Sequence, residues 1–226
     1  MSTPTSNLKP LVLHAHAAGP NPFKPAIVLE ALSLPYTVKL WDFGPAANGV
    51  KGPAFLKITE NGRVPALEDP NTGVVAWESG AVINYLLRVY DQKNTLGPRG
   101  DSEQDRVDFD KWIFFLVSGL GPMQGQANWY KHYNGTENAD ALKRYREQTY
   151  RCYGVLEGQL VKSGGASILK GGVSAVDAHF YPWVSTLPYA ELSYDDYPNV
   201  KKWVESYKQR KEVKAAYEKV AKGEKA

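Results

Sequence analysis

The sequence has few residues that could form disulfides, insert into a membrane or bind a metal ion. Its only cysteine is Cys152, so no disulfide can form within the chain, and a reducing, cytoplasmic location is expected. The N-terminal residues, which include Pro4 and Pro10, hold no apolar run, so neither a signal peptide nor a membrane span is expected. His14 and His16 share one face of a strand, but nothing nearby supplies further ligands, so we expect structural histidines and no metal.

A large excess of charge of either sign is also missing. The chain has 27 basic and 24 acidic residues, a formal net charge of +3. The only lysine-rich stretch, residues 208–225, alternates with glutamates, which is typical of a solvated helix face. Nucleic acid is therefore not an expected partner. No repeat or low-complexity tract is present, and 226 residues suffice for one large domain or two small ones.

The hydrophobic pattern changes near residue 92. Before it, short apolar runs alternate with amphipathic helices in the order β-α-β-α-β-β-α, which is typical of a thioredoxin-like domain. After a break at residues 91–100 the pattern is helical only. We therefore predict an α/β plus all-α protein, with a thioredoxin-like domain over residues 1–92 and an α-helical bundle domain over 101–226. The predicted helices of the second domain are 102–120, 139–161, 174–187 and 198–221.

Two short motifs in the first domain predict a site for a peptide. Residues 62–67 (GRVPAL) read as a loop entering a strand, where the residue before proline is extended and a cis Val64–Pro65 bond fits. In the second motif, Glu78 and Ser79 open a helix, whose free N–H groups and Ser79 hydroxyl suit an anion while Glu78 suits an ammonium. An extended peptide with a free carboxylate and a free amine, such as γ-glutamyl-cysteinyl-glycine, meets these demands.

Asn21 precedes a helix whose first residue is expected to be Pro22. One interpretation is an ordinary N-cap. The other is a neutral amide donor that, with the helix N-terminus, favours a ligand thiolate over the thiol. The two roles are compatible, and neither involves proton transfer, because an amide is not a base. Lys51 lies before the Pro65 loop and is a candidate for a second carboxylate, although most isolated lysines are only solvated.

The segment 112–133 is rich in aromatic and amide side chains. It either belongs to the core or forms the wall of an apolar cosubstrate pocket, and Gly119, Gly121 and Gly125 are expected to break its helix. Ser174 and Asp177 predict a capping box of structural value only. The candidate pocket residues are Phe115, Met123, Gln124, Trp129 and His132.

The chain resembles the fungal nitrogen-regulator-like class of the glutathione S-transferases. The resemblance implies that Asn21 faces the glutathione sulfur, that the Val64 backbone pairs with the cysteinyl unit, and that Glu78 with Ser79 holds the γ-glutamyl end. Lys51 would approach the glycyl carboxylate, and Arg63 belongs to the motif, either as a ligand contact or as a backbone anchor. The matching segments are Pro20-Asn21 with Phe23-Lys24, Pro53 with Phe55, residues 61–67, residues 77–81, and residues 119–122 with Gly125-Gln126 and Trp129.

The resemblance implies an enzyme that uses glutathione as cosubstrate or cofactor and adds its thiolate to a small hydrophobic electrophile. Release of the adduct gives conjugation, whereas reversal after bond rotation gives cis-trans isomerisation. Fungal members often serve secondary metabolism, and family members usually form homodimers. Cys152 lies in the helical half, which disfavours a thiol-reductase function. The alternative is a non-catalytic, glutathione-binding regulator acting through protein contacts, which the early first strand disfavours because such relatives carry a polar extension.

Overall fold

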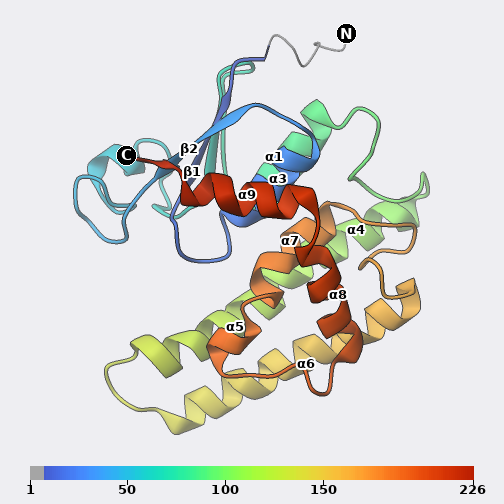
Figure 1. Cartoon of the computed structure of the whole chain (residues 1–226). Coiled ribbons are helices and arrows are strands. Elements are labelled where there is room, and N and C mark those ends of the chain that lie inside the picture. Colours follow the sequence, from blue (N-terminus) through green and yellow to red (C-terminus); the bar gives the residue numbers. More distant parts are fainter. Residues whose placement is uncertain (1–7) are drawn as a thin grey trace. The chain divides into compact units, whose positions relative to one another are not determined.

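The computed structural model describes residues 8–226, so the expectations for the first seven residues lie outside it. It divides into two compact units. The first holds the chain up to residue 93 together with Gln209–Ala226, and the second holds Asn94–Lys208. The expected fold class is confirmed, with a thioredoxin-like sheet and helix unit and a helical unit (Figure 1). The expected second domain, 101–226, is wrong at its C-terminal end, because residues 209–226 belong to the first unit.

The first unit is built on a five-stranded sheet in the order β4-β3-β1-β2-β5. β1 pairs in parallel with β2 and antiparallel with β3, β3 pairs antiparallel with β4, and β2 pairs in parallel with β5. The sequence pattern predicted every one of these strands except the last. The elements are β1 (Leu11–Ala15), α1 (Phe23–Ala31), β2 (Tyr36–Leu40), α2 (Pro53–Leu56), β3 (Ala66–Asp69), β4 (Val74–Trp77), α3 (Ser79–Tyr90), α9 (Lys211–Ala221) and β5 (Glu224–Lys225).

Helix α1 is the central helix of this unit. Its residues Phe23–Leu29 are all buried, which is typical of a helix covered on every side. It packs against both α3 and α9. Phe23 stacks on Tyr217 of α9, with ring centroids 4.1 Å apart. Lys24 is the only charged residue in the buried stretch of α1, and it becomes important at the functional site.

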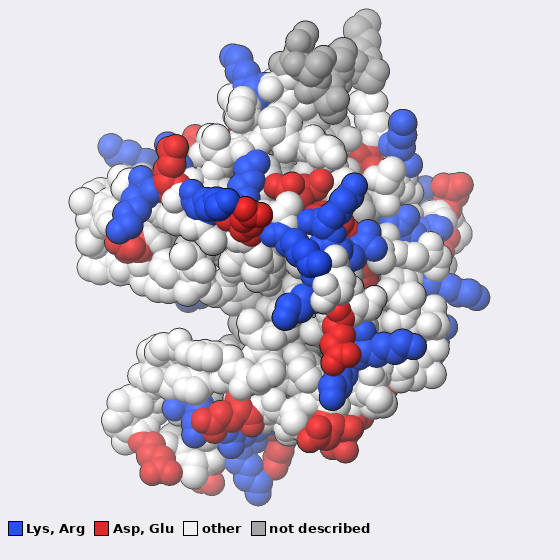
Figure 2. Space-filling model, in the orientation of Figure 1, with Lys and Arg blue, Asp and Glu red and all other residues white. Residues whose placement is uncertain are grey.

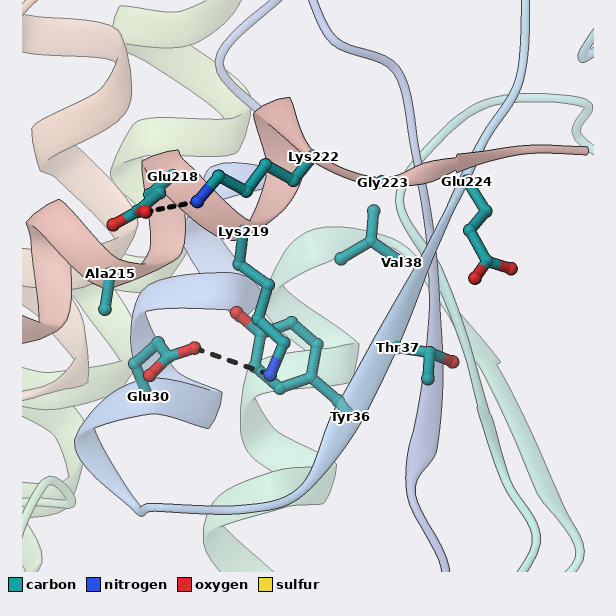
Figure 3. Close-up of a pocket in the computed structure, with 10 residues that line it drawn as sticks. All are labelled: Glu30, Tyr36, Thr37, Val38, Ala215, Glu218, Lys219, Lys222, Gly223 and Glu224. Atoms are coloured by element: carbon teal, nitrogen blue, oxygen red, sulfur yellow. Dashed lines mark hydrogen bonds and ion pairs between the residues drawn. The ribbon is translucent and has the colours of Figure 1, made fainter.

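The C-terminal segment returns to the first unit because α9 covers α1 and β5 extends the sheet (Figure 1). Lys219 lies over the ring of Tyr36, 3.9 Å from its centroid, and 3.9 Å from a carboxylate oxygen of Glu30 (Figure 3). A groove of about 410 Å³ runs between these elements. The lysine-rich end is therefore solvated on one face only, since Val213, Ala216 and Val220 of α9 are buried.

The turn between α9 and β5 gives a stability prediction. A Cβ on Gly223 would lie 2.8 Å from Leu40 Cγ and 2.8 Å from Val38 Cγ1 of β2, so G223A should lower the free energy of unfolding by about 1–3 kcal/mol through overpacking. The matched control is G154A, on an exposed face of helix α6 (Ala139–Ser163), where an added Cβ meets nothing within 4 Å. That change should raise the free energy by roughly 0.5–1 kcal/mol. Urea unfolding measures both, and equal effects would contradict the packing argument.

The second unit is helical throughout. Capping boxes begin α4 and α7, formed by Ser102 with Asp105 and by the predicted pair Ser174 with Asp177. Buried Asp177 also accepts hydrogen bonds from the Ile168 backbone N–H and the Trp203 indole. The elements are α4 (Glu103–Phe115), η2 (Leu116–Leu120), α5 (Gly121–Asn128), η3 (Trp129–Tyr133), α6 (Ala139–Ser163), α7 (Ala175–Val184), η4 (Leu187–Ala190) and α8 (Pro198–Lys208).

Two expectations for the helical half are corrected. Gly119, Gly121 and Gly125 do not break the helix, because π-helical turns carry it onward from α4 to Tyr133. A Cβ on Gly125 would lie 3.2 Å from the Trp183 ring, so this glycine permits close packing instead. The predicted helix 198–221 is two helices, α8 and α9, which belong to different units.

The surface carries charges of both signs. Basic and acidic side chains are interspersed on the face shown in Figure 2. None of the helices within residues 8–226 combines the length and the apolar character that crossing a membrane demands. In that same part of the chain, no group of three or more His, Cys, Asp or Glu side chains gathers as a metal site.

Candidate functional site

The GRVPAL loop has the backbone that the sequence predicted. The Val64–Pro65 peptide bond is cis, and β3 begins directly afterwards at Ala66. Gly62 has φ +57°, and a Cβ there would lie 2.7 Å from the carbonyl oxygen of Val50. Both observations require glycine, since other residues rarely adopt this backbone and would collide with Val50. The loop is thereby held close to the segment that carries Lys51.

A small apolar cluster supports this loop from below. It contains Trp41, Val50, Phe55 and Ala66, with Val64 packed against it. His14 joins the cluster through Trp41, whose indole N–H donates to His14 Nδ1 at 2.9 Å. The other ring nitrogen of His14 lies 2.6 Å from Glu68 Oε1, and since Nδ1 is an acceptor, Nε2 is the donor. Burial lowers the pKa of His14, so the ring acts as a neutral structural bridge, as expected for this histidine.

Four of the predicted site residues line one cavity of the first unit: Asn21, Lys51, Arg63 and Val64. Its volume is about 340 Å³, within the range of small-molecule sites. Lys51 is exposed, and its ammonium donates to the Asn61 carbonyl at 2.8 Å. The remaining lining residues are Ala18, Gly19, Pro20, Pro22, Phe43, Gly44, Val50 and Gly62.

Asn21 lies in the turn before α1, half-buried. The expected side-chain cap is wrong. Helix α1 begins at Phe23 with Pro22 as its N-cap, and no side chain caps it, because Pro22 takes helical backbone angles and shifts the start by one residue. Asn21 instead uses its backbone carbonyl, which accepts from the Lys24 N–H at 3.3 Å. Asn21 is nonetheless one of the residues that line the cavity, at the start of α1.

Glu78 and Ser79 lie at the start of α3, as predicted, and are not among the residues that line the cavity. Glu78 is exposed and has φ 68° and ψ 118°, a backbone conformation that costs a non-glycine residue roughly 1–3 kcal/mol. Its carboxylate does not cap the helix, so the first N–H groups of α3 stay available to another acceptor. Ser79 is only 4% exposed.

Lys24 connects the two halves of the site, and sequence reasoning missed its role. Its ammonium donates to Ser79 Oγ at 3.3 Å, so the first turns of α1 and α3 meet through this contact. The side chain is 2% exposed. Burial lowers the pKa of Lys24 to about 7, against the opposing influence of the Glu78 charge. The sequence did contain one indication of this role, because Lys24 is the second residue of a helix whose first two turns are otherwise apolar.

The predicted cosubstrate residues are divided between the interior and the surface of the second unit. Gln124 is fully buried, and its amide binds the Trp183 carbonyl at 2.9 Å and the Tyr153 hydroxyl at 2.9 Å, which favours the core interpretation. Phe115 and Met123 are half-buried. Trp129 is exposed, and exposed His132 binds the Tyr189 carbonyl at 2.6 Å. Their cosubstrate role stays a prediction.

The arrangement in the first unit suits one kind of ligand. Asn21, the start of α1 and the loop that contains Val64 line the cavity. The start of α3 is joined to α1 through buried Lys24. Helix starts and cationic groups favour anions, and a neutral amide can donate to a thiolate. An extended, multiply charged peptide with a thiol matches these features.

Comparison with known proteins identifies relatives over the whole fold. A family model for the glutathione S-transferase N-terminal domain matches residues 9–88, and one for the C-terminal domain matches residues 124–219. The glutathione S-transferase-like protein gedE of Aspergillus terreus is 37% identical over 209 residues, which is 87% of this chain and 89% of the relative. Protein URE2 of Candida maltosa is 35% identical over 189 residues, 82% of this chain and 56% of the relative.

The structural similarity is equally extensive. The glutathione transferase URE2P6 of Phanerochaete chrysosporium, solved in complex with oxidized glutathione, superimposes with a TM-score of 0.86 at 33% sequence identity. The match covers 96% of this chain and 99% of that structure.

Proposed function

The chain belongs to the glutathione S-transferase family, and on that premise we propose that it is an enzyme that binds glutathione and adds its thiolate to a small hydrophobic electrophile. The observation that carries this proposal is the shared cavity of Asn21, Lys51, Arg63 and Val64. Four residues that the family resemblance assigns to glutathione, from three separate segments, gather around one space of suitable size.

In the proposed complex each group meets one part of the tripeptide. The Asn21 amide donates to the sulfur, and the Val64 backbone pairs with the cysteinyl unit. Lys51, with Arg63 beside it, meets the glycyl carboxylate. Glu78 holds the amine of the γ-glutamyl end, while Ser79 and the first N–H groups of α3 hold its carboxylate.

The chemistry needs orientation and thiolate stabilisation more than proton transfer. A thiolate held by one amide and by the field of α1 is a ready nucleophile. Its attack on an electrophilic carbon forms a C–S bond, and protonation of the resulting carbanion completes conjugation. If the C–S bond of a reversible adduct to a conjugated alkene breaks after rotation, the thiolate leaves and the net result is isomerisation. A hydrophobic cosubstrate pocket in the helical unit, a homodimer and a function in fungal secondary metabolism belong to the same proposal.

A second candidate is a regulator that binds glutathione without turnover. The similarity to proteins named URE2, and to a structure described as the nitrogen regulation fragment of the yeast prion protein Ure2p, favours this alternative. Both candidates use the same glutathione site, so binding alone does not separate them.

The deciding experiment is incubation of the protein with glutathione and a panel of conjugated, electrophilic alkenes, followed by chromatography with mass detection. A product heavier by one glutathione supports the transferase. A glutathione-dependent product of unchanged mass and shifted retention supports the isomerase. Glutathione binding without any turnover favours the regulator, and absence of glutathione binding would contradict both candidates.

A further inference from the structure

Lys24 is an unusual residue to find inside a protein. It is among the largest fully buried side chains, and its ammonium has one hydrogen-bond acceptor, Ser79 Oγ. Within residues 8–226 no carboxylate lies within ion-pairing distance of it. Burying a cation without a paired anion opposes folding. An apolar residue at this position would pack without that cost, so packing alone does not explain a lysine here.

The Lys24 ammonium lies next to the start of α3, where an anion would bind. Ser79 is the first residue of α3, where the helix presents unsatisfied N–H groups. The Ser79 oxygen accepts from Lys24, which leaves the hydroxyl hydrogen free to donate in another direction. A carboxylate at the start of α3 would then receive the Ser79 hydroxyl, the helix N–H groups and a positive charge behind them. It would also supply the counter-charge that Lys24 lacks.

We propose that Lys24 is a positioning residue for the γ-glutamyl carboxylate, which it serves by fixing the Ser79 hydroxyl toward the ligand and by balancing the ligand's negative charge from behind. This inference rests on the proposed function, because it requires glutathione at the start of α3. Lys24 does not touch the ligand and takes no part in the chemistry.

The charged groups on the helices that pack against α1 leave Lys24 without a paired carboxylate. Of the helices packed on α1, α3 brings the carboxylate of its N-cap residue Glu78 near Lys24, and the one charged residue within α3, Arg88, lies in its last turn. On α9, buried Glu212 is paired with Arg210. The charged groups of α9 and α1 nearer the sheet edge, Lys219 and Glu30, pair with each other.

The direction of the pH effect follows from the lowered pKa. In the free protein the pKa of Lys24 is about 7, and a bound carboxylate raises it. At pH 6 Lys24 is already charged, so binding takes up no proton. At pH 8 it is mostly neutral in the free protein and must gain a proton on binding. Affinity should therefore fall by about tenfold between pH 6 and pH 8.

The test is calorimetric titration with S-methylglutathione, whose blocked thiol removes the ligand's own thiol proton. Titrations at pH 6 and pH 8, each in two buffers of different ionisation enthalpy, give the number of protons exchanged. Wild-type protein should take up close to one proton at pH 8 and almost none at pH 6.

K24M should bind S-methylglutathione about tenfold more weakly than wild type at pH 6. Its affinity should not depend on pH, it should take up no proton on binding, and its Tm should not fall. K57M, which alters an exposed lysine of the same unit, should match wild type.

K24R gives a second test that does not depend on how K24M folds. Arginine keeps the charge but does not deprotonate, so affinity should persist at pH 8 while proton uptake disappears. The inference would be overturned if K24M kept the proton uptake and the affinity of wild type, or if wild type took up no proton at pH 8. Either result would leave the proposed function intact. Absence of S-methylglutathione binding to wild type at both pH values would overturn the proposed function and this inference with it.

Discussion

N21A should lower kcat/KM of the glutathione-dependent reaction by about a hundredfold, the usual effect of losing one donor to a developing or resident anion. Asn21 lines the cavity at the start of α1, where the proposed thiolate lies. Without it the pKa of the bound thiol rises. The residual activity should then increase toward higher pH. The pH profile of kcat/KM should therefore move to higher pH, in addition to the loss of activity at pH 7.

Two further variants at this position test the physical cause. N21S keeps a hydrogen-bond donor on a shorter side chain and should recover part of the rate. N21D keeps the size of the amide but replaces the donor with a negative charge, so it should lose at least as much activity as N21A. Glutathione affinity, measured by calorimetry, should change far less than kcat. A wild-type rate and pH profile in N21A would show that another group stabilises the thiolate.

E78Q should weaken glutathione binding by a factor of roughly 10 to 100, because a hydrogen bond to a charged partner contributes about 1.5–3 kcal/mol. Glu78 is exposed at the start of α3, where its carboxylate caps nothing. The change to glutamine keeps the shape and the backbone while removing the charge that meets the ligand's amine. Titration of glutathione at pH 7 measures the effect, and the free energy of unfolding should stay the same.

The matched variant E78G separates ligand binding from backbone strain. It removes the same carboxylate and also relieves the positive φ of residue 78. Relief of roughly 1–3 kcal/mol, less the roughly 0.5–1 kcal/mol that glycine loses in chain entropy, should raise the free energy of unfolding by about 1 kcal/mol. Urea unfolding of wild type, E78Q and E78G measures this. A less stable E78G would mean that the surrounding structure does not strain Glu78.

Local patterns predicted the elements of the first unit closely. The start of α3 at Ser79 was correct to the residue, because an apolar run ends at Trp77 and a helix-periodic pattern begins directly after Glu78. The cis Val64–Pro65 bond and the Ser174 capping box were also expected from neighbouring residues alone. The start of α1 was misplaced by one residue, since Pro22 serves as N-cap in place of Asn21.

Long-range contacts account for what the sequence did not show. Nothing in residues 209–226 distinguishes α9 from a last helix of the helical half, because an amphipathic pattern shows that a face is buried and not what buries it. The same limit applied to Gln124, whose amide is used by Trp183 and Tyr153, far away in the chain.

The sequence by itself determined the family, the order of strands and helices, and the residue types of the glutathione motif, because each depends on neighbours a few positions apart. Only the tertiary structure decided that Asn21, Lys51, Arg63 and Val64 share a cavity, and that Lys24 stands behind Ser79. Lys24 and Ser79 are 55 residues apart, and their contact arises only when α1 and α3 pack together. Burial, which gives this lysine its distinct chemistry, is a property of that packing and not of the residue.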